Sequence, residues 1–161
     1  KTAHPFQYFL YFPSDGLWDT AVTYHFECRY AGGLTMVVAS EDEFKNGIRF
    51  IGDKGDVCVS RGNKLETTPV GLKDRPLGPN DIHLYVSNQH EDNWIQSIKT
   101  RRPNICTAEI GHRTATICHL SGIADRLRRP LKWDPVKEEI LGDPEASRWM
   151  DRPRRAPYTY I

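Results

Sequence analysis

Strict alternation along residues 22–30, "VTYHFECRY", is the sequence feature that most constrains the fold. Successive side chains of a strand point to opposite faces, so this segment predicts a strand with one buried face and one wetter face. The side that we expect to be buried carries Val22, Tyr24, Phe26, Cys28 and Tyr30. The other side carries His25, Glu27 and Arg29, which we interpret as a polar subunit interface, with a substrate cleft as the alternative.

More strands follow at short intervals. Residues 34–40, "LTMVVAS", predict the strand that returns after the turn "AGG". A second hairpin is expected from strands at about 48–52 and 56–60, and "KLETTP" can add a further short strand. Because short turns join consecutive strands, the sheet is predicted to be antiparallel.

Two segments in the second half of the chain predict amphipathic helices. Asn88 and Glu91 have the spacing of a capping box, and the helix that they start ends at "RRPN", residues 101–104. A longer helix is expected to begin after Thr107 and to stop before Pro130. Its apolar stripe consists of Ile110, Ile117, Leu120, Ala124 and Leu127.

The order of these elements predicts the fold class. Strands come first and helices follow, with no alternation of strand and helix, which favours an α+β fold over a doubly wound one. A short third helix is expected where Asp143 caps the "DPEAS" segment and Pro144 takes its first position. The length of 161 residues fits a single domain, residues 1–161.

Charge and hydropathy exclude two classes of partner. The net charge is only +1, and the longest apolar runs, such as "LTMVVA", are far shorter than the ~20 residues that span a bilayer. Seven arginines between residues 126 and 155 stand among aromatic residues, a combination also found in nucleic-acid-binding proteins. Seven acidic residues are interleaved with them, so we interpret this region as ion pairs between helix and tail. We expect neither a nucleic acid nor a membrane as partner.

Several chemical signatures are missing. The sequence contains no GxGxxG, GxxxxGK[ST], HExxH or CxxC motif, so we assign no catalytic, cofactor-binding or metal-binding residue to this chain. Its four cysteines are predicted to be buried free thiols, with disulfides as the alternative in an exported protein. The compartment, cytoplasmic or periplasmic, is not specified. The chain lacks an initiator methionine, and we expect it to be part of a longer protein.

Three polar side chains are candidates for substrate binding: His90, Asn93 and His112. His112 and His119 are seven residues apart on one helix face, ~10 Å along the axis, whereas metal ligands on a helix need a spacing of three or four. His112 lies off the apolar stripe, which favours a solvated or structurally hydrogen-bonded histidine, with a polar contact to the sheet or to another domain as the alternative. His90 and Asn93 stand near a helix start, which favours polar ligands, with helix capping and surface exposure as the alternative interpretation.

Five motifs occur in a familiar order: "YAGGLTMVVAS", "GIRFIGDKGDVCVSRG", "HEDNWIQSIKTRRPN", "AEIGHRTATICHLSGIADRLRRPLKWDP" and "GDPEASRWMDRPRRAPY". Together they resemble the C-terminal domain of bacterial oxidoreductases of the Gfo/Idh/MocA family, over roughly residues 20–161. The resemblance implies a large, open, mostly antiparallel sheet with helices on one face. The other face of that sheet commonly packs against a second subunit, which implies a homo-oligomer.

The resemblance also implies a function for the complete enzyme. An N-terminal Rossmann domain would hold NAD or NADP, and a sugar or polyol would lie between the two domains and exchange a hydride with the nicotinamide. The glycine-rich loop, the Glu-Lys-Pro lysine and the Asp-x-x-x-His pair of the family are missing here. We therefore predict a substrate-binding and oligomerisation domain that is inert without its Rossmann domain and binds no cofactor alone.

Two alternative functions remain open. The chain could be a non-catalytic, self-associating interaction module. It could also belong to relatives that use NAD transiently to cleave glycosides. The coding sequence upstream of Lys1 and product analysis of the full-length protein would distinguish these hypotheses.

Overall fold

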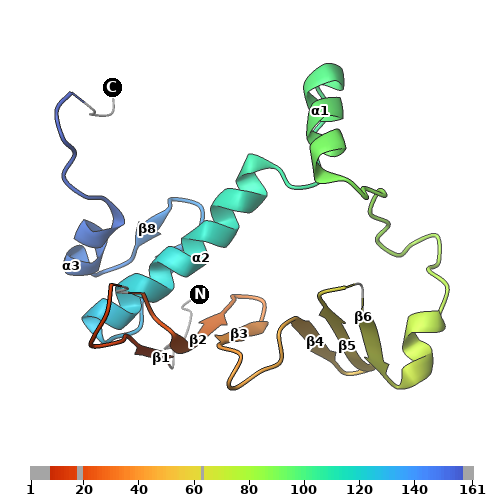
Figure 1. Ribbon diagram of the computed structural model, residues 1–161, viewed down its shortest axis with the longest axis horizontal. Helices are drawn as coiled ribbons and strands as arrows, with labels where there is room; N and C mark the ends of the chain where they lie inside the picture. Colours follow the sequence, from red (N-terminus) through yellow and green to blue (C-terminus); the bar gives the residue numbers. More distant parts are fainter. Residues whose placement is uncertain (1–7, 18–19, 63, 158–161) are drawn as a thin grey trace. The chain divides into compact units, whose positions relative to one another are not determined.

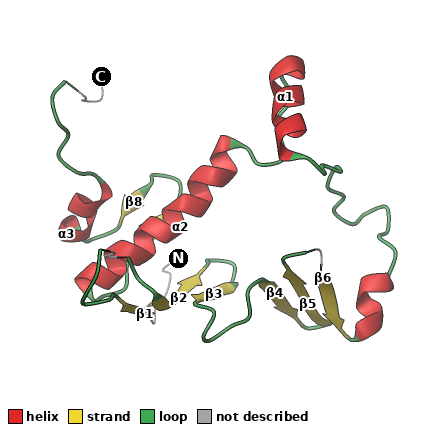
Figure 2. Ribbon diagram, in the orientation of Figure 1, coloured by secondary structure: helices red, strands yellow, loops and turns green. Residues whose placement is uncertain are grey.

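The computed structural model describes residues 8–17, 20–62 and 64–157. The chain divides into two compact units, which are described separately here: Lys1–Asp42 together with Ala108–Ile161, and Glu43–Thr107. Figure 1 labels the elements along the chain, and Figure 2 distinguishes helices, strands and loops. None of the helices in the described part of the chain has the length and apolar character needed to cross a membrane.

The first unit contains the predicted alternating strand. Strands β1 (Tyr8–Tyr11), β2 (Thr23–Arg29) and β3 (Thr35–Ala39) form an antiparallel sheet in the order β1-β2-β3. Phe26, which pairs with Val38 in the register, is the buried side chain of β2. Val22 and Tyr30 were expected on the buried face, but they lie just beyond the strand ends and are 56% and 43% exposed.

The longest element of this unit is α2 (Ala108–Leu127), which contacts β1 (Figure 1). Only its C-terminal half enters the core, where Ile123 and Ala124 are buried. The predicted apolar stripe is therefore confirmed in part, because Leu120 and Leu127 pack against the core whereas Ile110 is 51% exposed. Among the described residues, the buried core does not extend to the N-terminal half of α2, so Ile110 stays in contact with water.

The C-terminal segment folds back against α2. It forms a short hairpin of β7 (Trp133–Asp134) and β8 (Glu139–Ile140), followed by α3 (Pro144–Ser147) and the 3₁₀ helix η2 (Arg148–Met150). Three of its side chains complete the core around Ile123 and Ala124: Leu131, Ile140 and Ala146. This hairpin could not be predicted from the sequence, because two-residue strands are too short to show an alternating pattern.

Asp143 joins this segment to the end of α2. Its carboxylate accepts a hydrogen bond from the Ala146 backbone nitrogen at 3.0 Å, which confirms the predicted cap of α3. The same carboxylate pairs with both ends of the Arg129 guanidinium, at 2.8 Å to Nε and 2.9 Å to Nη2. Arg129 Nη2 also donates to Glu145 at 2.6 Å. Ion pairing was predicted between the helix and the tail, whereas the ion pairs seen here join the end of α2 to the start of α3.

The second unit contains the other sheet. Strands β4 (Ile48–Gly52), β5 (Gly55–Ser60) and β6 (Lys64–Thr68) are antiparallel in the order β4-β5-β6, followed by the 3₁₀ helix η1 (Val70–Asp74). Gly55, at the start of β5, has a φ of 134°, and a Cβ there would lie 2.1 Å from the Thr68 carbonyl oxygen. Close pairing of β5 and β6 therefore requires glycine at this position.

Helix α1 (His90–Thr100) also belongs to the second unit, and its start differs from the prediction. The cap residue is Gln89, with no side-chain hydrogen bond, so the capping box built on Asn88 is wrong. The apolar stripe of α1 is not covered either, since no residue of this helix is buried and Trp94 is 60% exposed. The capping-box spacing did predict a helix start in this region, but the observed cap lies one residue further along the chain.

The predicted fold class is confirmed at the level of antiparallel strands followed by helices. The described strands form three separate sheets, of three, three and two strands, and not the single large sheet that was expected. Sequence alternation locates a strand and its faces but does not identify the strand beside it. The number of strands that pair in one sheet therefore does not follow from the sequence pattern.

A matched pair of isoleucines on α2 tests this description of the core. Ile123→Ala should lower the free energy of unfolding of the 161-residue chain by about 2–5 kcal/mol, because it leaves a cavity beside Ala146. Ile110→Ala, the same change on the exposed half of the helix, should alter it by no more than about 0.5 kcal/mol. Urea unfolding followed by circular dichroism measures both, and equal losses would contradict the one-sided core.

Asp143 should make the stability of the fold depend on pH. Its hydrogen bonds with Arg129, followed by the bond from the Ala146 N–H, lower the pKa of its carboxyl from 3.8 to about 2. The stabilisation is therefore complete above the unfolded-state pKa and is lost as the pH falls from about 4 towards 2. In thermal unfolding, Asp143→Asn should be less stable than wild type at neutral pH and lose less stability on acidification. Asp53→Asn, an exposed acid in the β4–β5 turn, should keep the wild-type profile.

Candidate functional site

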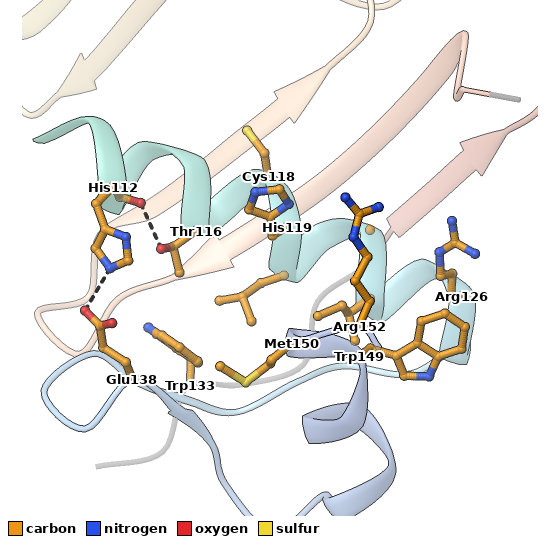
Figure 3. Close-up of a pocket in the computed structure, with 13 residues that line it drawn as sticks. His112, Thr116, Cys118, His119, Arg126, Trp133, Glu138, Trp149, Met150 and Arg152 are labelled. Atoms are coloured by element: carbon orange, nitrogen blue, oxygen red, sulfur yellow. Dashed lines mark hydrogen bonds and ion pairs between the residues drawn. The ribbon is translucent and has the colours of Figure 1, made fainter. Parts of the chain in front are cut away.

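A groove of about 590 Å³ runs along one flank of α2 in the first unit. Figure 3 shows the side chains that line it, which come from α2 on one side and from the C-terminal segment on the other. The lining residues are His112, Thr116, Cys118, His119, Leu120, Gly122, Ile123, Arg126, Trp133, Glu138, Trp149, Met150 and Arg152. Its volume is within the range of about 300–1,000 Å³ that is usual for small-molecule sites.

His112 and Glu138 form one end of this groove. The His112 ring nitrogen Nε2 lies 2.9 Å from Glu138 Oε1, and Figure 3 shows the two side chains facing each other. The same carboxylate oxygen pairs with Arg113 Nη1 at 3.1 Å. Arg113 also donates to the Pro135 carbonyl oxygen at 2.6 Å and to Glu109 at 2.7 Å. The β7–β8 turn is thus tied to α2, and His112 is held in a defined orientation.

The carboxylate also determines which nitrogen of His112 carries a hydrogen. A carboxylate accepts hydrogen bonds, so Nε2 must donate to Glu138. In the neutral ring the other nitrogen, Nδ1, is then an acceptor. Within the described residues Nδ1 has no partner, so it is available to accept a hydrogen bond from a hydroxyl group. The polar contact of His112 is therefore a hydrogen bond to Glu138, in the turn between β7 and β8.

Aromatic and basic side chains form the other end of the groove. The guanidinium of Arg126 stands over the Trp149 ring, with its carbon 5.3 Å from the ring centroid. This distance is within the range of a cation–π contact. Trp133 and Met150 add an apolar wall, and Arg152 reaches the groove from the tail (Figure 3). The sequence does not identify any of these residues as a site candidate, although arginines stand among aromatic residues in this region.

His90 and Asn93, the other predicted site residues, belong to the second unit. Asn93 is engaged in local structure: its Oδ1 accepts the Ile105 N–H at 3.0 Å, and its Nδ2 donates to the Tyr85 hydroxyl at 3.1 Å. His90 is the first residue of α1 and is exposed. Their role in substrate binding stays a prediction, as does that of His112.

His112 and His119 do share one face of α2, as predicted, since both line the groove. Throughout the described ranges, no group of three or more histidine, cysteine, aspartate or glutamate side chains is arranged to hold a metal ion. The imidazole of His112 has Glu138 as its polar partner. The groove therefore offers a ligand an acceptor for its hydroxyl groups, guanidinium groups and aromatic surfaces.

The four cysteines are free, as expected, but none of them is fully buried. Cys28 and Cys58 are half-buried and Cys106 and Cys118 are exposed, so the prediction of buried thiols is wrong. Cys118 is one of the residues that line the groove. Cys28 is half-buried in β2, and this burial, followed by the charge of Cys118, raises its pKa to about 11. Its thiolate is therefore scarce at neutral pH.

Comparison with known proteins gives one match. The sequence profile described as "Oxidoreductase family, C-terminal alpha/beta domain", of the Gfo/Idh/MocA type, covers residues 18–160. Searches of curated proteins and of solved structures returned no significant match. The profile spans both units, including the groove on α2 and the sheet of β4, β5 and β6.

Proposed function

This chain belongs to the Gfo/Idh/MocA oxidoreductase family as its C-terminal α/β domain, and from that membership we propose that it binds the substrate and mediates oligomerisation. A C-terminal domain implies an N-terminal domain as its partner, and members of the family typically depend on NAD or NADP. The proposed reaction is hydride exchange between the nicotinamide and a sugar or polyol. The match over residues 18–160 is the observation that carries this proposal.

The residues of this chain do not fit a dinucleotide. A dinucleotide fold needs a glycine-rich turn that leads directly from a strand into a helix, whose N-terminus then receives the pyrophosphate. Here long loops precede both α1 and α2, at residues 75–89 and 101–107, and neither loop is glycine-rich. We therefore place the cofactor in the N-terminal domain and derive no step through it from this chain.

The groove on α2 supports a role in binding a hydroxylated substrate. His112, oriented by Glu138, offers Nδ1 as an acceptor for a sugar hydroxyl. Thr116 has its hydroxyl bonded to the His112 carbonyl oxygen at 2.8 Å, and it lies next to this acceptor on the groove wall. Trp133 and Leu120 offer apolar surface to the C–H face of a sugar ring. Concave sites with apolar walls and a few fixed polar groups are typical for small ligands.

The sheet of the second unit supports a role in association. Its register places Ile48 opposite Val59, and Phe50 opposite Val57, so apolar side chains share one face. Leu65 joins them from β6, opposite Val59. Ile48, Phe50 and Leu65 are 61%, 63% and 46% exposed, which is unusual for side chains gathered on one face. In the proposal a second copy of the protein covers this face.

The test is a cofactor-reduction assay of the full-length protein over a panel of sugars and polyols, with NAD and NADP. At least one substrate should give reduced cofactor, and His112→Ala should raise its KM roughly five- to tenfold through the loss of one hydrogen bond. His90→Ala tests the second candidate in the same assay. His83→Ala is the matched control, since its ring bonds the Gly78 carbonyl oxygen outside the groove.

Three results would count against the proposal. Absence of reduced cofactor with every substrate would contradict net oxidation. Cleavage of a glycoside without net reduction would instead support the redox-neutral alternative. An unchanged KM in His112→Ala would remove this residue from the substrate site.

A further inference from the structure

Two arginines at one end of the groove on α2 have no acidic partner. No carboxylate in the described residues lies within ion-pair distance of the guanidinium of Arg126 or of Arg152. Other arginines of the same unit are paired with acids at 2.6–3.3 Å: Arg29, Arg113, Arg128, Arg129 and Arg154. Acids are therefore available in this region, but they are engaged elsewhere.

Arg126 is held in place without being neutralised. Its contact with the Trp149 ring orients the guanidinium, and a ring has no net charge to cancel that of the arginine. The planar guanidinium keeps its N–H donors in the fork that matches a carboxylate or a phosphate. An oriented guanidinium of this kind loses little freedom when an anion binds, which favours affinity.

The guanidinium of Arg152 is left without a carboxylate partner for a different reason. The nearest acid in sequence is Asp151, which accepts the backbone N–H of Arg152 at 2.8 Å and pairs with the Arg154 guanidinium at 3.2 Å. The hydrogen bond from the Arg152 backbone N–H, followed by the pairing with Arg154 and the charge of the Arg152 side chain, lowers the pKa of Asp151. The Asp151 carboxylate is therefore ionised, and its hydrogen bonds go to the Arg152 backbone and to Arg154, whereas it acts on the Arg152 guanidinium only through its charge. The side chain of Arg152 lines the groove beside α2, and Figure 3 labels it between His119 and Trp149.

Glu138, an acid that lines the groove, is too far from Arg126 to take the place of an anionic ligand there. Glu138 is bound to His112 and Arg113, and His112 lies fourteen residues before Arg126 on α2, ~21 Å along the helix axis. The groove thus has a hydroxyl-binding end at His112 and a positively charged end at Arg126. Trp133, Met150 and Ile123 form apolar surface on the groove wall.

We propose that Arg126 and Arg152 bind the carboxylate or phosphate group of an acidic sugar, and that the sugar ring lies against the apolar wall of the groove. This inference rests on the proposed function for the sugar part of the ligand. The two guanidinium groups supply charge-assisted hydrogen bonds to the anion, and Trp149 keeps one of them in position. Neutral sugars leave both guanidinium groups without a partner, so the site discriminates against them.

Isothermal titration of the full-length protein, without nicotinamide cofactor, tests the proposal. The probes are D-glucuronate, D-glucose 6-phosphate and the neutral D-glucose. At least one acidic sugar should bind at least about tenfold more tightly than D-glucose, and the better one shows whether the group is a carboxylate or a phosphate. Arg126→Gln and Arg152→Gln should each weaken that binding by at least about tenfold.

Arg148→Gln is the matched control. Arg148 stands next to Trp149 in η2 and carries the same charge, but it does not line the groove. This variant should bind the acidic sugar as wild type does, and circular dichroism should show all three variants folded. Equal binding of acidic and neutral sugars, no binding of either acidic sugar, or equal losses in all three variants would overturn the proposal.

The titration is independent of turnover. An acidic sugar that binds to the arginines while the protein reduces no cofactor would leave the anion site standing and reject the proposed reaction. Cofactor reduction with a neutral polyol, combined with no binding of acidic sugars, would support the proposed reaction and reject the anion site. The two proposals therefore fail separately.

Discussion

The bidentate ion pair between Arg129 and Asp143 is the interaction on which the rest of the first unit depends. It joins Arg129, the second residue after α2, to Asp143, the cap of α3, and thereby closes the chain segment between them against the helix. With the segment closed, Ile140 and Ala146 reach Ile123 and complete a small core. Because this core buries few side chains, apolar burial alone stabilises it weakly. The ion pair between Arg129 and Asp143 therefore contributes much to holding the segment against the helix.

The groove follows from this closure. One wall is α2, and the other consists of the hairpin and η2, which are held in place by the same segment. The contact of Glu138 with His112 ties the far end of the hairpin to α2, and Trp149 supports Arg126 at the near end. The chemistry of the groove, a hydroxyl acceptor at one end and two unpaired guanidinium groups at the other, is therefore a consequence of how residues 128–152 lie on the helix. It is not a property of α2 alone.

Much of the local structure could be predicted from the sequence, since alternation, turn residues and helix signals act over a few neighbours. The strands from β2 to β6, the helices α1 and α2, and the Asp143 cap were found in this way. What could not be predicted depends on distant partners. Trp133, Glu138 and Trp149 become groove residues only when the chain folds back on α2, and no spacing rule connects them to His112. Ile110 belongs to an apolar stripe by its spacing, yet it is exposed, because the buried core of the described residues lies at the other end of α2.

Amide hydrogen exchange of an Arg129→Met variant tests most directly whether the ion pair with Asp143 builds the groove. Loss of the pair should accelerate exchange in the hairpin, in η2 and in residues 120–127 of α2, while the sheet of β4, β5 and β6 exchanges as in wild type. Binding of an acidic sugar should weaken together with this loss of protection, although Arg129 does not line the groove. Unchanged exchange in the hairpin and η2 would contradict the dependence of the groove on this ion pair.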